Sequence, residues 1–507
     1  MIIIIESVHK MKEILSASQM QACDNHTIEL HGIPSLVLME RAALAVVETI
    51  DKYYPQANSF AVVCGPGNNG GDGVAIARLL SLKGKKVNCV VLGDSDKFST
   101  QLRQEISIAK SYDLSIEKEL NKNAINQADL TIDAMFGIGL TRGLSGDFED
   151  AAVYINQSAK KVLAVDIPSG YDADCGKLLG TTGVLADLTV TFAYMKKGLI
   201  LGDCKVAAGK VEVADVGIYL DKSDDKYDTI IEADILKQVN PRPVNANKGS
   251  CGKLLIIAGS ESIYGACFLA AKAALQTGAG LVKIYTHKNN ILSIQQNLPE
   301  AMYLGYDSFN ASELSKEMNW ADAVLIGPGL GTEELSSMLL RQVLKEINVP
   351  LVIDADGLNL ISRNDLKADF KAAAERIPVI ITPHLKEMER LCGTSTKEIN
   401  YNMEQVAKSY ALENGCIVVL KNFTTVVASK GQTYFVTSGN EALATPGSGD
   451  VLAGIIASFV LQKVCDDCEM SVCAAVFLHG FAGVKASEKY GTRGVLASHI
   501  IDYIPKL

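Results

Sequence analysis

Short apolar runs that end abruptly in loops rich in glycine or aspartate recur along this chain. Residues 59–64 are such a run, ending in Gly65-Pro66-Gly67-Asn68-Asn69-Gly70-Gly71-Asp72-Gly73 before a helical pattern resumes at residues 74–82. A strand, a glycine loop and a helix in this order form the βα unit of a doubly wound sheet. Ligands bind beyond the carboxyl ends of the strands in such sheets, so these loops are the first candidates for a site.

Three further strands are expected in the first half at residues 86–92, 128–133 and 162–166. Asp133 ends one of them, and Asp166-Ile167-Pro168-Ser169-Gly170 follows the next. We expect Asn69, Asp133 and Ser169 to converge at one crevice. These side chains offer only oxygen ligands and one formal charge, which suits a weakly charged hard cation better than zinc. The alternative is that Asp133 and Ser169 cap the helices that follow them.

A lysine follows the next expected strand, residues 187–192. Lys196 is predicted to face the same crevice, pair with Asp166 and take part in acid–base chemistry. The plainer interpretation is a lysine in solvent at the end of a strand.

The chain divides near residue 220, because 507 residues exceed what one hydrophobic core holds and residues 221–227 are short, polar and dense in charge. We predict domains at residues 1–220 and 241–507, with residues 221–240 as a linker and adapter. The second domain shows the same alternation of expected strands and helices. Its expected strands lie at 253–258, 280–285, 323–327, 349–354, 379–382, 417–421 and 424–428.

One stretch of the second half, residues 440–454, joins a glycine-rich turn to an apolar segment that is typical of a buried helix. We expect the helix to begin near Gly449, where free backbone N–H groups and the helix dipole attract phosphate. Asp450 beside that phosphate predicts a base for an attacking hydroxyl. The alternative is an ordinary helix cap. Asp354 and Asp356 follow another strand and could help Asp450 organise a metal–phosphate site.

The motifs of the first half together resemble the NAD(P)H-hydrate epimerase domain, over about residues 11–219. These are the glycine loop, the segment from Asp133 to Gly143 and Val165-Asp166-Ile167-Pro168-Ser169-Gly170. The resemblance implies interconversion of the R and S forms of a reduced nicotinamide hydroxylated at C6, with K⁺ held by Asn69, Asp133 and Ser169. We assign the proton shuttle to Asp166 and Lys196. The residues that the resemblance places around the hydrated nucleotide are Asn68, Asn69, Gly70, Gly71, Asp72, Gly137, Ile138, Gly139, Leu140, Thr141, Arg142, Gly143 and Asp166.

The second half resembles ADP/ATP-dependent NAD(P)H-hydrate dehydratases, a branch of the ribokinase-like enzymes, over about residues 230–507. The motifs are Ala444-Thr445-Pro446-Gly447-Ser448-Gly449-Asp450, Gly327-Pro328-Gly329-Leu330-Gly331 and Thr382-Pro383-His384. Where the family usually has Pro-His-Pro-Gly-Glu, this chain has Pro383-His384-Leu385-Lys386-Glu387. The resemblance implies that the hydrated nicotinamide lies against Gly329, His384, Leu385, Lys386, Glu387, Met388, Glu389, Arg390 and Asp450. It implies that the adenine nucleotide lies against Lys421, Asn422, Phe423, Thr424, Thr425, Asn440, Glu441, Ala442, Leu443, Ala444, Thr445, Pro446, Gly447, Ser448 and Gly449.

The whole chain is therefore expected to be α/β, with a Rossmann-like three-layer domain followed by a ribokinase-like three-layer domain. It resembles the bifunctional NAD(P)H-hydrate repair enzymes, which implies NADHX and NADPHX as substrates, ADP (or ATP) as phosphoryl donor, and Mg²⁺. A formal charge of −10 argues against nucleic-acid or anionic-membrane partners. Scattered cysteines without a secretory signal favour a cytoplasmic protein, which we expect to form a homo-oligomer.

Two other functions are compatible with these patterns. One is a ribokinase-like vitamin or sugar kinase fused to a nucleotide-binding regulatory domain, because fold alone does not fix the reaction. The other treats the first domain as a binding module without catalysis.

Overall fold

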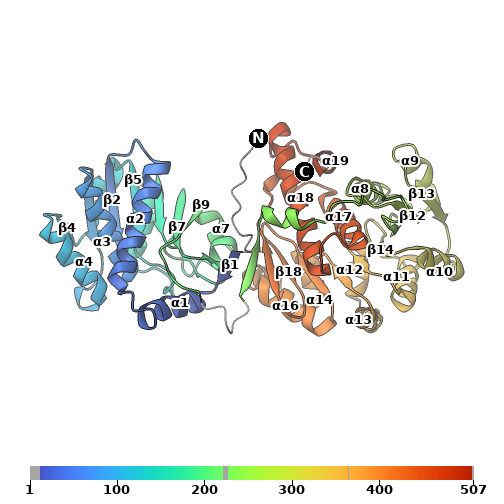
Figure 1. Cartoon of the computed structure of the whole chain (residues 1–507), viewed down its shortest axis with the longest axis horizontal. Helices are drawn as coiled ribbons and strands as arrows, with labels where there is room; N and C mark the ends of the chain where they lie inside the picture. The colour runs from blue at the N-terminus through green and yellow to red at the C-terminus, as the bar shows by residue number, and fades with distance from the viewer. Residues whose placement is uncertain (1–11, 221–226, 364, 505–507) are drawn as a thin grey trace. The chain divides into compact units, whose positions relative to one another are not determined.

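The computed structural model describes residues 12–220, 227–363 and 365–504. The chain forms two compact units, which divide between Tyr227 and Asp228. We call residues 13–227 the N-terminal unit and residues 228–504 the C-terminal unit (Figure 1). Of the predicted linker and adapter at residues 221–240, residues 221–226 lie outside the described residues, and residues 228–240 belong to the C-terminal unit. The first eleven residues also lie outside the described ones.

The N-terminal unit is built on a parallel sheet with strand order β4-β3-β2-β5-β6-β7-β9. The strands of this sheet are β2 (Ser59–Cys64), β3 (Lys86–Val91), β4 (Ile116–Glu117), β5 (Leu130–Ala134), β6 (Val162–Val165), β7 (Leu188–Phe192) and β9 (Lys210–Ala214). Two short strands, β1 (Lys12–Leu15) and β8 (Met195–Lys196), pair with each other beside it. The longer helices are α1 (Ala17–Glu29), α2 (Ser35–Tyr53), α3 (Asn68–Leu82), α4 (Thr100–Ser111), α5 (Lys122–Gln127) and α6 (Asp147–Ser158).

Helices cover both faces of this sheet, so its strands are buried on both sides, as parallel strands usually are. Alternate residues of β2 show the two faces. Phe60 and Val62 pack with α2, α3 and α4, whereas Ala61 and Val63 pack with α5 and α6. The unit therefore has three layers.

The C-terminal unit holds a second, larger sheet with strand order β13-β12-β11-β14-β15-β16-β17-β18-β19-β10. Its strands are β10 (Asp228–Ile231), β11 (Lys253–Ile257), β12 (Leu281–His287), β13 (Met302–Tyr306), β14 (Ala323–Ile326), β15 (Leu351–Ile353), β16 (Val379–Ile381), β17 (Ile417–Leu420), β18 (Thr425–Ala428) and β19 (Thr433–Val436). Pairing is parallel from β13 to β17, antiparallel around β18, and parallel again between β19 and β10.

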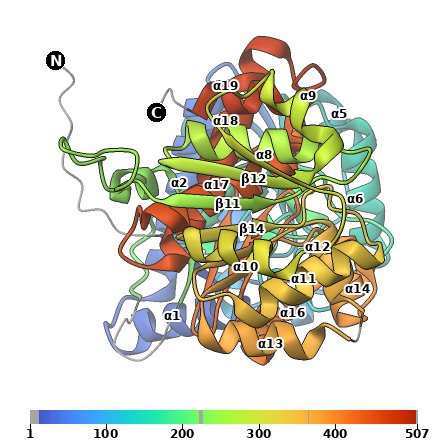
Figure 2. The ribbon, with the colours of Figure 1, turned by 90° about the vertical axis from the view of Figure 1, so that its right-hand side faces the viewer.

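Helices also lie on both sides of this sheet (Figure 2). One layer contains α8 (Gly265–Gln276), α17 (Ser448–Gln462), α18 (Cys468–Tyr490) and α19 (Ala497–Tyr503). The opposite side carries α10 (Ala311–Trp320), α11 (Glu334–Glu346), α13 (Lys367–Arg376) and α16 (Met403–Asn414). Shorter helices include α9 (Ile291–Gln295), α12 (Asp356–Ile361), α14 (Leu385–Cys392) and α15 (Thr396–Tyr401). Both units are thus α/β with mainly parallel sheets, and the predicted fold class is confirmed.

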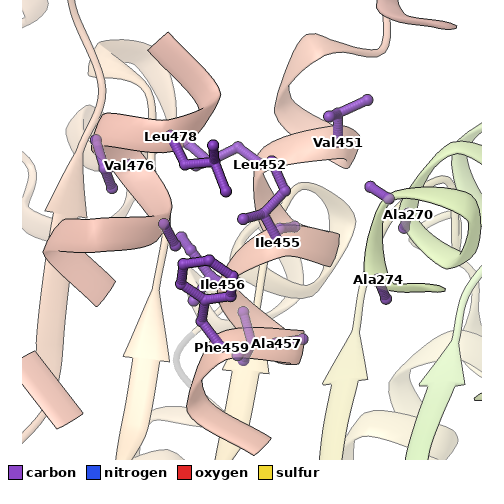
Figure 3. Close-up of a cluster of buried hydrophobic side chains, with 14 of the residues drawn as sticks. Ala270, Ala274, Val451, Leu452, Ile455, Ile456, Ala457, Phe459, Val476 and Leu478 are labelled. Atoms are coloured by element: carbon purple, nitrogen blue, oxygen red, sulfur yellow. The ribbon is translucent and has the colours of Figure 1, made fainter. Parts of the chain in front are cut away.

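Helix α17 is the centre of the C-terminal core. Its apolar side chains, among them Leu452 and Ile455, lie between α8 and α18 (Figure 3). A Cβ on Gly454 would overlap the carbonyl oxygen of Ala270, so this glycine permits the close approach of α17 to α8. Helix α18 is long and apolar enough to cross a membrane by composition, but 78% of its apolar window is buried inside the unit. It is therefore a core helix of the C-terminal unit.

Helix α1 starts where Ser16 makes a capping box with Gln19. A sequence-based boundary was wrong at the start of α3. The glycine loop expected to continue to Gly73 ends at Gly67, and α3 already begins at Asn68. Gly73 lies within α3, and a Cβ there would lie 2.5 Å from the Ala134 Cβ. Only glycine at this position therefore lets α3 pack so closely on the sheet.

Candidate active sites

The predicted motifs of the N-terminal unit all lie at the carboxyl ends of β2, β5 and β6, which are neighbours in the sheet. Asn68 to Asp72 form the first turns of α3 after β2. Residues 137–143 form the loop between β5 and α6, and Asp166 and Ser169 follow β6. The topology therefore brings these segments to one edge of the sheet.

Asp133 and Ser169 are in direct contact. The Ser169 hydroxyl donates to Asp133 Oδ1 at 2.7 Å, and the Ser169 backbone N–H donates to Oδ2 at 2.8 Å. The Phe136 N–H donates in turn to Ser169 Oγ at 2.9 Å. The helix-cap alternative is wrong for Asp133, because the next helix, α6, starts at Asp147 and has Gly146 as its N-cap.

The Asp133 carboxylate is fully buried, and burial raises its pKa to about 6 even though hydrogen bonds from Ser169 and Met135 oppose the rise. These donors are neutral, so the buried charge would be offset by a bound monovalent cation. Oxygen atoms of this kind fit K⁺ better than a transition metal. No group of three His, Cys, Asp or Glu side chains within residues 12–220, 227–363 and 365–504 is arranged to hold a metal ion.

Asn69 faces the same loop. A Cβ built on Gly137 would lie 3.3 Å from Asn69 Oδ1 and 3.0 Å from Asp166 Oδ2, so the two side chains meet over this glycine. The Asn69 Nδ2 atom is buried and has no hydrogen-bond partner. Buried polar atoms are normally paired, so this amide fits a site that takes a ligand or an ion.

Asp166 and Lys196 form the predicted ion pair, with Nζ 2.8 Å from Oδ1. Lys196 is 1% exposed, and its Nζ also donates to Thr191 Oγ1 and to the Phe192 carbonyl oxygen. Thr191 Oγ1 donates to the same Asp166 oxygen at 3.1 Å. All three N–H donors of Lys196 are thus engaged. The other carboxylate oxygen of Asp166, Oδ2, faces Gly137. Asp166 has φ +68°, a backbone conformation that costs energy outside glycine and is common at functional sites.

Two further carboxyl groups stand near this pair. Burial raises the pKa of Asp24, on α1, and the charge of Asp166 adds to the rise. Burial likewise raises the pKa of Asp72 well above its usual range, with Asp166 and Asp24 contributing. Sequence reasoning included Asp72 but missed Asp24, because α1 reaches the site only through tertiary packing of Met20 and Cys23 with Ile138.

The remaining predicted residues of this loop are less enclosed. Gly139, Thr141 and Arg142 are exposed, whereas Ile138 and Leu140 are partly buried. Gly143 packs against Gly180, with 2.7 Å between the Gly180 Cα and a Cβ built on Gly143. Residues 139–142 therefore form the most exposed part of residues 137–143.

In the C-terminal unit the glycine-rich turn leads directly into α17, as predicted. Gly447 is the N-cap with φ +86°, no side chain caps the helix, and Asp450 occupies the third helical position. Asp450 is therefore not an ordinary helix cap. Burial raises the pKa of Asp450 to about 7, Asp354 adds to the rise, and Lys421 opposes it. A carboxyl group that titrates near neutral pH is suited to act as a general base.

Lys421 lies beside this helix start. Its Nζ is 3.0 Å from Asp354 Oδ1, and it would lie 3.4 Å from a Cβ on Gly449. Burial lowers the pKa of Lys421, but Asp354 and Glu387 outweigh this and hold it above the ordinary value. Lys421 was predicted as a nucleotide contact, and the structure shows that it also neutralises the carboxylates around Asp450.

The departure at Leu385-Lys386 leaves the start of α14 intact. His384 Nδ1 accepts from the Lys386 and Glu387 N–H groups, and Glu387 Oε2 accepts from the His384 N–H at 2.8 Å. This reciprocal capping box fixes the turn without the family's proline and glycine. Burial raises the pKa of Glu387 to about 7, against the opposing charge of Lys421.

Asp356, Asn359 and Arg390 form a chain of hydrogen bonds next to the predicted substrate side. Asp356 Oδ2 accepts from the Gly331 N–H, Asn359 Nδ2 donates to Asp356 Oδ1, and Arg390 Nη1 donates to Asn359 Oδ1. Both oxygens of Asp356 are thus committed, and Asp354 is committed to Lys421.

The other predicted residues of this unit occupy separate positions along the site. Gly329, with φ +60°, faces the start of α8, since its Cβ would lie 2.8 Å from Ile263 Cγ2. Met388 is buried within α14. Asn422, Phe423 and Thr424 lie between β17 and β18, and Thr425 begins β18. Phe423 is 45% exposed. The segment Asn440, Glu441, Ala442, Leu443, Ala444, Thr445 and Pro446 runs from a 3₁₀ turn, residues 441–443, to the N-cap of α17.

Comparison with known proteins agrees with both halves. A family profile described as NAD(P)H-hydrate dehydratase matches residues 254–506, and one described as YjeF-related protein N-terminus matches residues 35–198. The bifunctional NAD(P)H-hydrate repair enzyme of Moorella thermoacetica is 34% identical over 97% of this chain and 96% of its own. That of Escherichia coli is 32% identical over 97% and 93%. Among solved structures, a hypothetical protein from Streptococcus mutans is 33% identical, with a TM-score of 0.50 over 55% of this chain and 98% of its own.

Proposed function

Because the chain belongs to the family of bifunctional NAD(P)H-hydrate repair enzymes, we propose that it repairs hydrated NADH and NADPH by two reactions. The N-terminal unit interconverts the R and S epimers, and the C-terminal unit dehydrates the S epimer. The observation that carries this proposal is the pair of separate acid–base sites, Asp166 with Lys196 in one unit and Asp450 in the other. A kinase with a regulatory domain has no use for the first site.

In the epimerase, we assign proton transfer at the substrate to Asp166 Oδ2. The opposite oxygen is held by Lys196 and Thr191, and Oδ2 faces the loop expected to bind the nucleotide. Lys196 supports this proton transfer by balancing the charge of the Asp166 carboxylate. All three of its N–H donors are already bonded. Asn69, Asp133 and Ser169 would hold K⁺, whose charge would offset the buried Asp133 and favour a bound anionic nucleotide.

In the dehydratase, Asp450 takes the proton of the C6 hydroxyl, which attacks the terminal phosphoryl group of ADP (or ATP). The phosphoryl group passes to the C6 oxygen, and AMP (or ADP) leaves. Loss of phosphate from C6, together with a proton from the neighbouring ring carbon, then restores the double bond of the reduced nicotinamide. Backbone N–H groups at Gly447 to Gly449 stabilise charge on the transferring group, and Mg²⁺ would enter with the phosphates. Gly329 and residues 384–390 border the nicotinamide side, and residues 421–425 and 440–449 the nucleotide side.

Location and assembly belong to the same proposal. No disulfide links cysteines within the described ranges, and most of these cysteines are buried, which supports a cytoplasmic protein. We propose a homo-oligomer without nucleic-acid or membrane partners, since the chain carries a formal charge of −10.

Two variants separate the reactions. Given a mixture of R- and S-NADHX, Asp450→Asn should equilibrate the epimers, resolved by chromatography, without forming NADH. Asp166→Ala should consume only S-NADHX when ADP or ATP and Mg²⁺ are added. Mixing the two variants should restore complete repair. Normal epimerisation by Asp166→Ala, or full dehydration by Asp450→Asn, would remove that residue from its role.

A further inference from the structure

Helix α18 packs against the start of the segment that is proposed to bind the adenine nucleotide and against the residues just before it. Ser438 Oγ donates to the Phe477 carbonyl oxygen at 3.1 Å, and Asn440 Nδ2 donates to Ser487 Oγ at 2.9 Å. A Cβ on Gly480 would overlap the Ser438 carbonyl oxygen, so the backbone of α18 lies in direct contact with the backbone at Ser438. One face of α18 therefore fixes residues 438–440.

The same helix reaches the phosphate turn through His479. Its Nε2 atom is 3.2 Å from the hydroxyl of Ser448, the first residue of α17, and both residues are 6% exposed. The side chain of Leu443 packs directly on Gly483 of α18, where a Cβ would overlap it. His479, Gly480 and Gly483 thus form one surface under the segment from residue 438 to residue 448.

His479 stays neutral at the pH of the reaction. Burial lowers its pKa to about 4, while a hydrogen bond to the Ser448 backbone opposes the change only in part. A neutral imidazole offers one donor and one acceptor and adds no net charge beside the phosphates. Its contribution is therefore geometric, which is what a turn that presents backbone N–H groups to a phosphoryl group needs.

We propose that His479 is a positioning residue for the dehydratase: its hydrogen bond to Ser448 holds the turn at Gly447 to Gly449 in the geometry that receives the nucleotide phosphates. His479 lies beneath Ser448 and acts through it, without touching the nucleotide. The inference rests on the proposed function, and it adds a residue of α18 that lies outside the sequence motifs.

The test uses the full chain and compares His479→Leu, which keeps bulk but cannot hydrogen-bond, with His479→Gln, which places an amide near the position of Nε2. We expect His479→Leu to raise the KM for the nucleotide or lower kcat by roughly tenfold, the scale of one lost buried hydrogen bond. His479→Gln should recover most of the loss, and the KM for S-NADHX should stay within about twofold in both, since no bond to the nicotinamide side is removed.

Three controls make the result decisive. Epimerase activity of the same preparations reports the amount of intact chain, and the fluorescence of Trp320 in α10 reports whether the C-terminal unit is folded. Glu488→Gln removes a surface ion pair with Lys485 on the same helix and should change neither activity. Ser448→Ala removes the same hydrogen bond by deleting the hydroxyl. Its effect should therefore not add to that of His479→Leu. This variant also provides the test if His479→Leu fails to fold.

The outcomes separate this inference from the proposed function. A wild-type chain without nucleotide-dependent dehydration would overturn both. An active wild type overturns the inference alone if His479→Leu keeps its kinetic constants, if His479→Gln and His479→Leu lose the same activity, or if the effects of Ser448→Ala and His479→Leu add. Rescue by glutamine with non-additive loss would establish it.

Discussion

Replacing Lys196 by methionine removes the cation from the buried pair with Asp166 while keeping a side chain of similar length. In the native unit Nζ lies 2.8 Å from Asp166 Oδ1 and donates to Thr191 and to the Phe192 carbonyl oxygen. The side chains of Lys196 and Asp166 are 1% and 11% exposed. Lys196→Met therefore leaves a nearly buried carboxylate without its counter-charge.

The expected cost follows from that geometry. Removing one partner of a buried ion pair costs about 3–5 kcal/mol, and we place this case near 3 kcal/mol because Asp166 keeps limited contact with solvent. The double variant Asp166→Asn/Lys196→Met should cost less than the sum of the single changes, with a coupling of about 2 kcal/mol.

Urea unfolding of the full chain measures this cost. With a urea dependence of about 1–3 kcal/mol per molar, a loss of 3 kcal/mol lowers the midpoint of the N-terminal unit by about 1 M or more. Far-UV circular dichroism reports the unfolding of both units, because both contain helices and strands. The transition that does not coincide with the fluorescence of the C-terminal unit is that of the N-terminal unit. The single tryptophan, Trp320, belongs to α10 of the C-terminal unit, so its fluorescence transition should not move. An unchanged midpoint for the N-terminal unit, or fully additive effects in the double variant, would refute the reasoning.

Three other consequences can be measured. The dehydratase rate should fall as pH falls through about 7, because the pKa of Asp450 is raised to about 7 and only the carboxylate accepts a proton; a flat pH–rate profile between pH 6 and 8 would contradict this. Gly454→Ala should destabilise the C-terminal unit by about 1–3 kcal/mol in urea, since its Cβ meets the Ala270 backbone; Trp320 fluorescence reports it, and a change below 0.5 kcal/mol would argue against the close helix contact. Replacing K⁺ by Na⁺ should slow epimerisation in the wild type but have little effect in Asp133→Asn; equal rates in both salts would dismiss the cation site.

Much of the fold follows from local pattern. Strand β2 was predicted at its observed bounds, because a buried parallel strand is an apolar run that stops at a turn signal. The start of α17 was predicted within one residue, since a left-handed glycine precedes an apolar helix there. The Asp166–Lys196 pair was predicted from strand order alone, and the ion pair is confirmed.

The misses share a different cause. Glycines at the start of α3 looked like loop residues because glycine has poor helix propensity, yet close packing on β2 and β5 requires them in the helix. Asp24 and His479 carry no local motif, and only tertiary packing brings α1 and α18 to the two sites. Lys421 has a second role that its position after β17 does not reveal, because its partner Asp354 follows a separate strand, β15.

The most direct test of the account is recovery of reduced-nicotinamide absorbance after wild-type chain, K⁺ and Mg²⁺ are added to a mixture of R- and S-NADHX, with ADP and ATP supplied in separate reactions. Complete recovery is expected with at least one nucleotide, because the first unit converts the R epimer to the S epimer that the second unit dehydrates. Recovery that stops at the S fraction, or no recovery with either nucleotide, would contradict it.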